Sequence, residues 1–105
     1  MDIKVDIYFT KDCVDWETAD ELVQQALQDL GLEADFNYWM VESDRQAFDY
    51  QFIGSPTIRV NGEDLFPVKG AASGLRLRSY FTAEGMVGHP TYDMIVEALT
   101  ERLGL

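Results

Sequence analysis

The amino-acid sequence predicts a single α/β domain over residues 1–105, with a mixed β-sheet of about four strands and helices on its faces. Three observations lead to this prediction. An alternating apolar segment comes first, a long amphipathic helical pattern follows, and a second strand pattern comes next. A strand–helix–strand unit of this kind places its two strands parallel. The Asn61-Gly62 pair then signals an antiparallel hairpin further along the chain.

The first half of the chain carries two strand patterns, each followed by a helical pattern. The strand segments alternate apolar and polar side chains or are rich in aromatic residues, which favours extended structure. In the first helical segment apolar side chains recur at three- and four-residue steps, and Gly31 suits the helix end. Ser43 is the expected N-cap of the second helix. The expected elements are a strand at residues 3–9, a helix at about 15–30, a strand at 33–41 and a shorter helix at 42–50.

A hairpin is expected just after the middle of the chain. Asn61-Gly62 suits a type I′ turn, because both central residues of that turn need positive φ. This turn would join strands at residues 57–60 and 64–66.

The last third of the chain is less regular until its final helix. Glycines break residues 69–90 into short pieces, within which the alternation at 75–81 favours an extended segment or an edge strand. Pro90 suits the first position of a C-terminal helix, and Gly104 follows the end of that helix. The predicted order of elements is therefore β-α-β-α-β-β-α.

The charge is strongly negative and unevenly distributed. The formal net charge is −11, and residues 1–50 carry 13 acidic and 3 basic side chains. Such a surface repels phosphate backbones, so we expect no nucleic-acid partner. The acidic half is interpreted as a solvated face, with a docking surface for a basic partner as the alternative.

Composition also bears on location. No stretch approaches the roughly 18–20 apolar residues of a membrane span, so no membrane partner is expected. One cysteine cannot form a disulfide within the chain, which argues against a small secreted scaffold. We therefore expect a cytoplasmic protein.

Cys13 is the only cysteine, and it lies where the first strand pattern runs into the first helix. A thiol at this junction is close to free backbone N–H groups and to the positive end of the helix dipole, which favour a thiolate. Lys11 would add to this effect, whereas Asp12, Asp15 and Glu17 would oppose it. Both a reactive thiol and a buried, inert cysteine stay open.

Two features resemble the thioredoxin-like superfamily: the thiol after the first strand, and the stretch Gly54-Ser55-Pro56-Thr57-Ile58 before the hairpin. The chain is similar to small bacterial thioredoxin/glutaredoxin-like domains, some relatives of which are found next to organomercurial lyases. The resemblance covers residues 3–103. It implies a thioredoxin-like fold with Pro56 in the cis form and Ser55 beside Cys13. It also implies Cys13 as the catalytic thiol and a partner-binding groove formed by Trp16, Ser55, Pro56 and Thr57.

The chain departs from that family at its second thiol. A dithiol site would read Cys-x-x-Cys, but here Trp16 holds the second position. Some relatives carry another cysteine near the Gly-Leu-Arg stretch, where this chain has Gly74-Leu75-Arg76-Leu77. A dithiol cycle within one chain is therefore impossible. Redox turnover would need an external thiol such as glutathione, or a second chain.

Three functions follow from these observations. The first is a monothiol redox or thiol-transfer protein in which Cys13 is the nucleophile, with protein thiols or glutathione as partners and no bound cofactor. The alternative is a redox-inactive thioredoxin-fold binding module. The third is capture of a mercurial or another soft metal by Cys13, which supplies a single good ligand.

The remaining candidate residues carry weaker signals. Lys69, Arg76 and Arg78 could hold the carboxylates of glutathione, although solvated strand residues are the default interpretation. His89 precedes Pro90 at a helix start, where a capping or loop role is expected. No cluster of Cys and His has the spacing of a structural zinc site.

Overall fold

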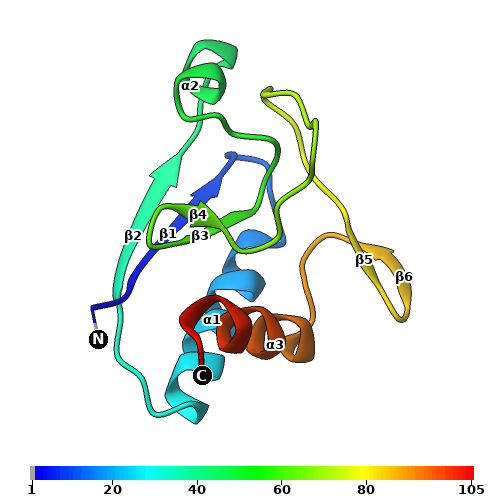
Figure 1. Ribbon diagram of the computed structural model, residues 1–105. Helices are drawn as coiled ribbons and strands as arrows, with labels where there is room; N and C mark the ends of the chain where they lie inside the picture. The colour runs from blue at the N-terminus through cyan, green and yellow to red at the C-terminus, as the bar shows by residue number, and fades with distance from the viewer. Residues whose placement is uncertain (1) are drawn as a thin grey trace.

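The computed structural model describes residues 2–105, which form a mixed α/β arrangement (Figure 1). The helices and strands follow the predicted order, with one additional hairpin before the last helix. They are β1 (Lys4–Phe9), α1 (Trp16–Asp29), β2 (Asp35–Met40), α2 (Asp44–Asp49), β3 (Thr57–Val60), β4 (Glu63–Asp64), β5 (Tyr80–Thr82), β6 (Gly85–Val87) and α3 (Tyr92–Leu103).

The main sheet has four strands in the order β2-β1-β3-β4. β1 pairs with β2 in parallel and with β3 antiparallel, and β3 pairs with β4 antiparallel. The predicted mixed sheet of four strands is therefore confirmed. β1 lies at its centre, and β2 forms one of its two edges (Figure 1).

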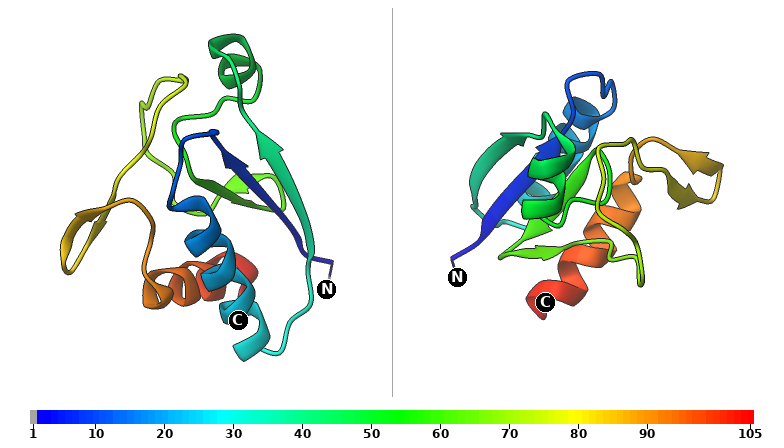
Figure 2. Two further views of the ribbon diagram at one scale, coloured as in Figure 1. Left: turned by 180° about the vertical axis from the view of Figure 1, so that it is seen from behind. Right: turned by 90° about the horizontal axis from the view of Figure 1, so that it is seen from above.

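Helices α1 and α3 pack side by side against one face of this sheet (Figures 1 and 2). Alternation in β1 directs Val5 and Ile7 to this face, and both side chains are fully buried. The apolar stripe of α1 and two residues of α3 complete the core. Its buried members are Ile3, Val5, Ile7, Ala19, Val23, Ala26, Leu27, Ile58, Val60, Leu65, Ile95 and Leu99.

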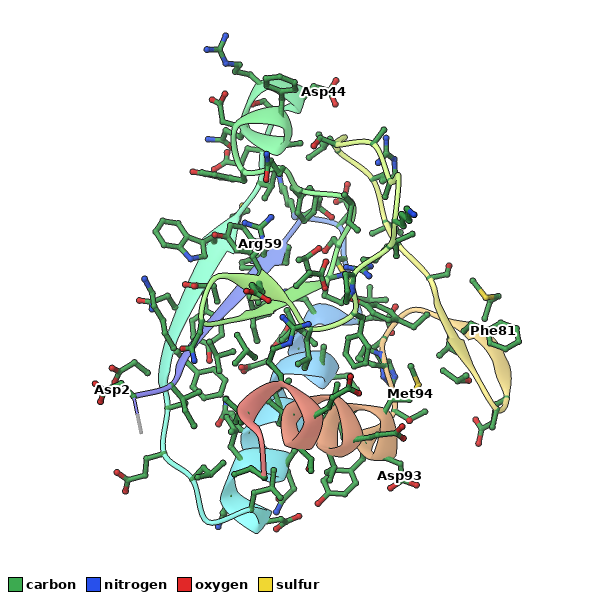
Figure 3. The ribbon with its side chains drawn as sticks, viewed as in Figure 1. Asp2, Asp44, Arg59, Phe81, Asp93 and Met94 are labelled. Carbon is green, nitrogen blue, oxygen red and sulfur yellow. The ribbon has the colours of Figure 1, made fainter. Side chains whose placement is uncertain are left out.

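The other face of the sheet differs from the prediction, because no helix among residues 2–105 lies over it. α2 is a helix of six residues, only about 9 Å long. It lies beyond the ends of β1 and β2 and packs on a small second cluster formed by Val41, Ala47 and Phe52 (Figure 1). Arg59 lies on this open face, with its guanidinium 4.4 Å from the centre of the Tyr8 ring (Figure 3).

The hairpin between β3 and β4 turns where the sequence predicts, but its second strand is shorter. Asn61 and Gly62 have φ angles of 52° and 87°, so both central residues adopt the positive values that the turn needs. β4 ends at Asp64 instead of continuing to Phe66. The Phe66 amide donates to the Asp64 carboxylate at 2.9 Å, which bends the chain out of the sheet.

Two features of the last third were not predicted. β5 and β6 form a separate two-stranded hairpin that projects from the body, with Phe81 pointing away from it (Figures 1 and 3). α3 begins at Tyr92, not at Pro90, because Thr91 is its N-cap and accepts from the Met94 amide. Residues 67–72, which lead from β4 toward this part, are all exposed. None of the helices described for residues 2–105 is long and apolar enough to cross a membrane.

Candidate functional site

The candidate site is built around the loop between β1 and α1, which carries Cys13. The Cys13 amide donates to the Thr10 carbonyl at 3.1 Å, which closes a tight turn directly after β1. The Thr10 amide in turn donates to the Ser55 hydroxyl at 2.9 Å. This bond fixes the Cys13 loop to the segment that precedes β3, 45 residues later in the chain.

The segment before β3 is fully buried. Its Ser55–Pro56 peptide bond is cis, the isomer that the resemblance implies. Ser55 and Thr57 are each 1% exposed, and the Thr57 hydroxyl donates to the Gly54 carbonyl. The structure thus brings the Thr10–Cys13 loop and residues 55–57 together at one end of β1 and β3.

Cys13 itself is buried, with 6% of its surface exposed. Tyr80, at the start of β5, is also buried and donates a hydrogen bond from its hydroxyl to the Pro56 carbonyl. Burial raises the pKa of the Tyr80 hydroxyl well above its usual value, Arg78 opposes this rise, and the charge of Asp64 adds to it. Tyr80 is therefore neutral at physiological pH.

The backbone of Ser55 is already paired with another part of the same chain. The Ser55 amide donates to the Arg76 carbonyl at 2.9 Å, and the Arg78 amide donates to the Ser55 carbonyl at 3.0 Å. These two bonds form a parallel bridge between Ser55 and Leu77. We refer to residues 74–80 as the covering segment. It occupies the strand-like position next to Ser55, so an extended partner could pair there only by displacing it.

Two contacts hold the covering segment in place. The Arg78 guanidinium, whose side chain is 7% exposed, forms an ion pair of 3.0 Å with Asp64 and donates to the Phe66 carbonyl at 2.8 Å. Gly54 allows the close approach of the backbone, because a Cβ atom there would lie 2.6 Å from the Arg78 Cβ. Its φ of +143° is also a value that side-chain-bearing residues rarely adopt.

Trp16 packs among aromatic side chains of β1 and β2. Its ring stacks on Phe9 with 4.1 Å between centroids and meets Tyr38 edge-on at 6.0 Å. Trp16 therefore joins α1 to the ends of β1 and β2 and contributes to packing. Its expected role in substrate binding stays a prediction.

An open groove of about 500 Å³ runs beside the thiol loop. Its lining mixes apolar side chains with two cations, Lys11 and Arg76, and two carboxylates, Asp12 and Glu42. The covering segment forms one wall. The remaining lining residues are Thr10, Met40, Val41, Leu75 and Leu77.

The basic residues and the histidine have separate surroundings. Arg78 is held by Asp64, whereas the Arg76 side chain donates to the Ala72 carbonyl and Lys69 is exposed. These three residues do not form one anion site. His89 is half-buried, with Nδ1 2.8 Å from the Pro90 carbonyl, so it belongs to the loop before α3. Among residues 2–105, no group of three or more His, Cys, Asp or Glu side chains is placed to hold a metal ion.

Sequence reasoning missed Tyr80, Gly54 and the ion pair of Arg78 with Asp64. The alternation at 75–81 did point to extended structure there, but it could not show which loop this segment covers. A search against family models, curated proteins and solved structures finds no match for this chain.

Proposed function

We propose that this chain has a thioredoxin-like fold. The sheet order β2-β1-β3-β4 and the parallel β1–β2 pair support this assignment. So does the position of Cys13, between β1 and α1 and on a loop bonded to Ser55. The β5–β6 hairpin is an addition to the predicted β-α-β-α-β-β-α order.

Within that fold, we propose a redox-inactive binding module instead of a thiol–disulfide oxidoreductase. The observation that carries this proposal is the double occupation of Ser55, whose amide and carbonyl are bonded to Arg76 and Arg78. A thiol-exchange partner needs access to the sulfur, and an extended protein partner would also use free backbone beside it. Here the chain itself occupies that backbone, and Cys13 is 6% exposed.

Thiol exchange with glutathione disulfide tests the proposal directly. We expect the folded protein to form no mixed disulfide at neutral pH, and to be labelled by iodoacetamide only after unfolding in urea. A Cys13→Ser variant gives the zero level for both measurements. Rapid formation of a glutathione adduct on the folded protein would overturn the proposal.

The second candidate is a monothiol transfer protein. It is favoured by the position of Cys13, on a loop between β1 and α1 whose Thr10 amide is bonded to the Ser55 hydroxyl. In that case an attacking Cys13 thiolate would form a mixed disulfide with one sulfur of glutathione disulfide and release glutathione thiolate. Capture of a mercurial by Cys13 would need the same access to its sulfur. A cytoplasmic location is part of both proposals.

A further inference from the structure

The outer edge of β2 presents unpaired backbone groups. β2 is the first strand in the sheet order, and no other described segment lies along its outer side in any view (Figures 1 and 2). The amides of Asp35 and Val41 point toward β1 and donate to the carbonyls of Ile3 and Phe9 at 2.9 and 2.8 Å. Because backbone groups alternate in direction along a strand, Phe36, Tyr38 and Met40 direct their amides and carbonyls outward.

This edge lacks the protection that edge strands usually carry. Native edges are blunted by a lysine, a proline, a bulge or very short length. β2 has six residues, no proline and no lysine, and its only charge is Asp35 at the first position. Its C-terminal half exposes large apolar side chains, since Tyr38, Trp39 and Met40 are 44%, 40% and 44% exposed.

The two exposed rings are held in fixed positions, one on each face of the strand. The Tyr38 hydroxyl donates to Asp20 of α1 at 2.8 Å. On the other face, the Trp39 indole donates to Asp6 at 2.9 Å and stacks on Tyr8. A partner strand would therefore meet rings that lose little further freedom on binding.

The negative charge around this edge favours a basic partner. From residue 12 to residue 44, which includes all of α1 and β2, the sequence holds ten acidic side chains and no Lys or Arg. An acidic or neutral strand would gain nothing from this field, and a second copy of the chain would bring a net charge of −11 of its own. A strand rich in Lys or Arg would gain attraction along its whole length.

We propose that the outer edge of β2 binds an extended, basic segment of a partner protein, which adds a fifth strand to the sheet. The inference rests on the proposed function, because it names the contact surface of the binding module. Backbone bonds to Phe36, Tyr38 and Met40 supply affinity, and alternate apolar side chains of the partner pack against Tyr38 or Trp39. The basic side chains face the acidic surroundings.

Hydrogen exchange at single amides, followed by NMR, tests this geometry. The probe is a peptide of about eight residues that alternates Lys with Val, long enough to span β2. We expect it to slow exchange at the amides of Phe36, Tyr38 and Met40 and to leave those of Asn37 and Trp39 unchanged. Binding should weaken strongly when salt rises from about 0.05 M to about 0.5 M. A matched Glu-Val peptide should not bind.

Two variants make the test specific. Tyr38→Pro removes one outward amide while the bonds to β1 remain, and should weaken peptide binding about tenfold relative to a Tyr38→Val control. Met40→Pro, compared with Met40→Ala, repeats the test near the strand end in case the first variant does not fold. Equal binding of the Glu-Val peptide, unchanged exchange at the three amides, or self-association through β2 would each overturn the inference.

The glutathione exchange assay and the peptide titration, both on the wild type, separate this inference from the proposed function. If Cys13 exchanges with glutathione disulfide while the peptide still protects β2, the binding-module proposal fails and the β2 site stands. If Cys13 is inert and the peptide does not bind, only the β2 site fails.

Discussion

The segment around Ser55, next to the Cys13 loop, and the outer edge of β2 both present strand-like backbone, but the chain uses them differently. At Ser55, the covering segment bonds to both backbone groups, and Cys13 is 6% exposed. At the edge of β2, the outward groups of Phe36, Tyr38 and Met40 have no neighbouring strand among residues 2–105. The backbone of Ser55 is occupied by the chain itself, whereas the edge of β2 is open and lies in a strongly acidic region.

This difference changes where a partner is expected. The resemblance to thioredoxin-like proteins would place a partner at the thiol. The hydrogen bonds instead favour a partner at β2, because unpaired backbone groups and exposed rings lie there. Substitutions that loosen the covering segment or alter the edge of β2 therefore test this difference.

The largest effect is expected from Arg78→Met, which breaks the buried ion pair with Asp64. Removing one partner of a buried pair leaves an uncompensated charge, so we expect about 3 kcal/mol of destabilisation in urea unfolding. Faster iodoacetamide labelling of Cys13 should accompany it, because the covering segment loses its anchor. Arg45→Met is the control, since the pair of Arg45 with Asp49 is exposed and should contribute at most about 0.5 kcal/mol.

Gly54→Ala disturbs the covering segment by a different route. Its Cβ would meet the Arg78 Cβ at 2.6 Å, and the φ of +143° disfavours any side chain. We expect a loss of about 2–3 kcal/mol, measured by urea unfolding. Gly31→Ala is the matched control: Gly31 also has positive φ, at +71°, but nothing lies within 4 Å of its Cβ position. Its loss should be about 1 kcal/mol. Equal losses would show that the covering segment does not press on Gly54.

Tyr80→Phe removes the hydrogen bond to the Pro56 carbonyl and should destabilise the fold by about 1–2 kcal/mol near pH 7. The pH dependence is a second readout. Because burial raises the pKa of Tyr80 above the usual value of about 10, the stability tied to its protonated hydroxyl is complete below about pH 10 and is lost as pH rises further. The difference between wild type and Tyr80→Phe should therefore shrink in alkaline solution. A difference that stays constant up to about pH 11 would contradict the buried hydroxyl.

The smallest effect concerns the edge. Burial and the hydrogen bond to Asp20 raise the pKa of Tyr38 to about 12. Asp20→Asn removes a negative charge beside the hydroxyl, so the pKa of Tyr38 should fall, as followed by ultraviolet absorbance against a Tyr38→Phe reference. Asp29→Asn should instead lower the pKa of Tyr92 and leave that of Tyr38 unchanged. An unchanged Tyr38 titration in Asp20→Asn would show that the ring is not held against α1.

The sequence predicted those elements whose side chains are buried on one side. α1 and β1 bury one stripe and one face respectively, so their apolar residues recur with the period of the element. The turn at Asn61-Gly62 was equally predictable, because both central residues of a type I′ turn must adopt positive φ. The β5–β6 hairpin was missed because each of its strands has only three residues, and only Tyr80 and Thr82 are buried while Phe81 and Met86 face solvent.

The site was less predictable than the fold. Cys13, Ser55 and Pro56 could be named from the resemblance, and the structure places the Cys13 loop against Ser55. Whether the site is covered depends on Arg78 and Tyr80, which lie more than 20 residues after Ser55. Contacts over such separations leave no periodicity in the sequence. The neighbouring residues in the sequence also do not show that position 54 needs a glycine because Arg78 packs against it.

The exposed residues 67–72 have a consequence for limited proteolysis. They link β4 to the covering segment, and Lys69 offers trypsin a cleavage site in a stretch with no buried residue. The C-terminal piece would still hold the N-terminal one through Arg78 with Asp64, through Arg102 with Glu63, and through the packing of α3 on α1. A nicked chain should therefore stay assembled, and two separately produced fragments divided after Lys69 should reconstitute the fold when mixed.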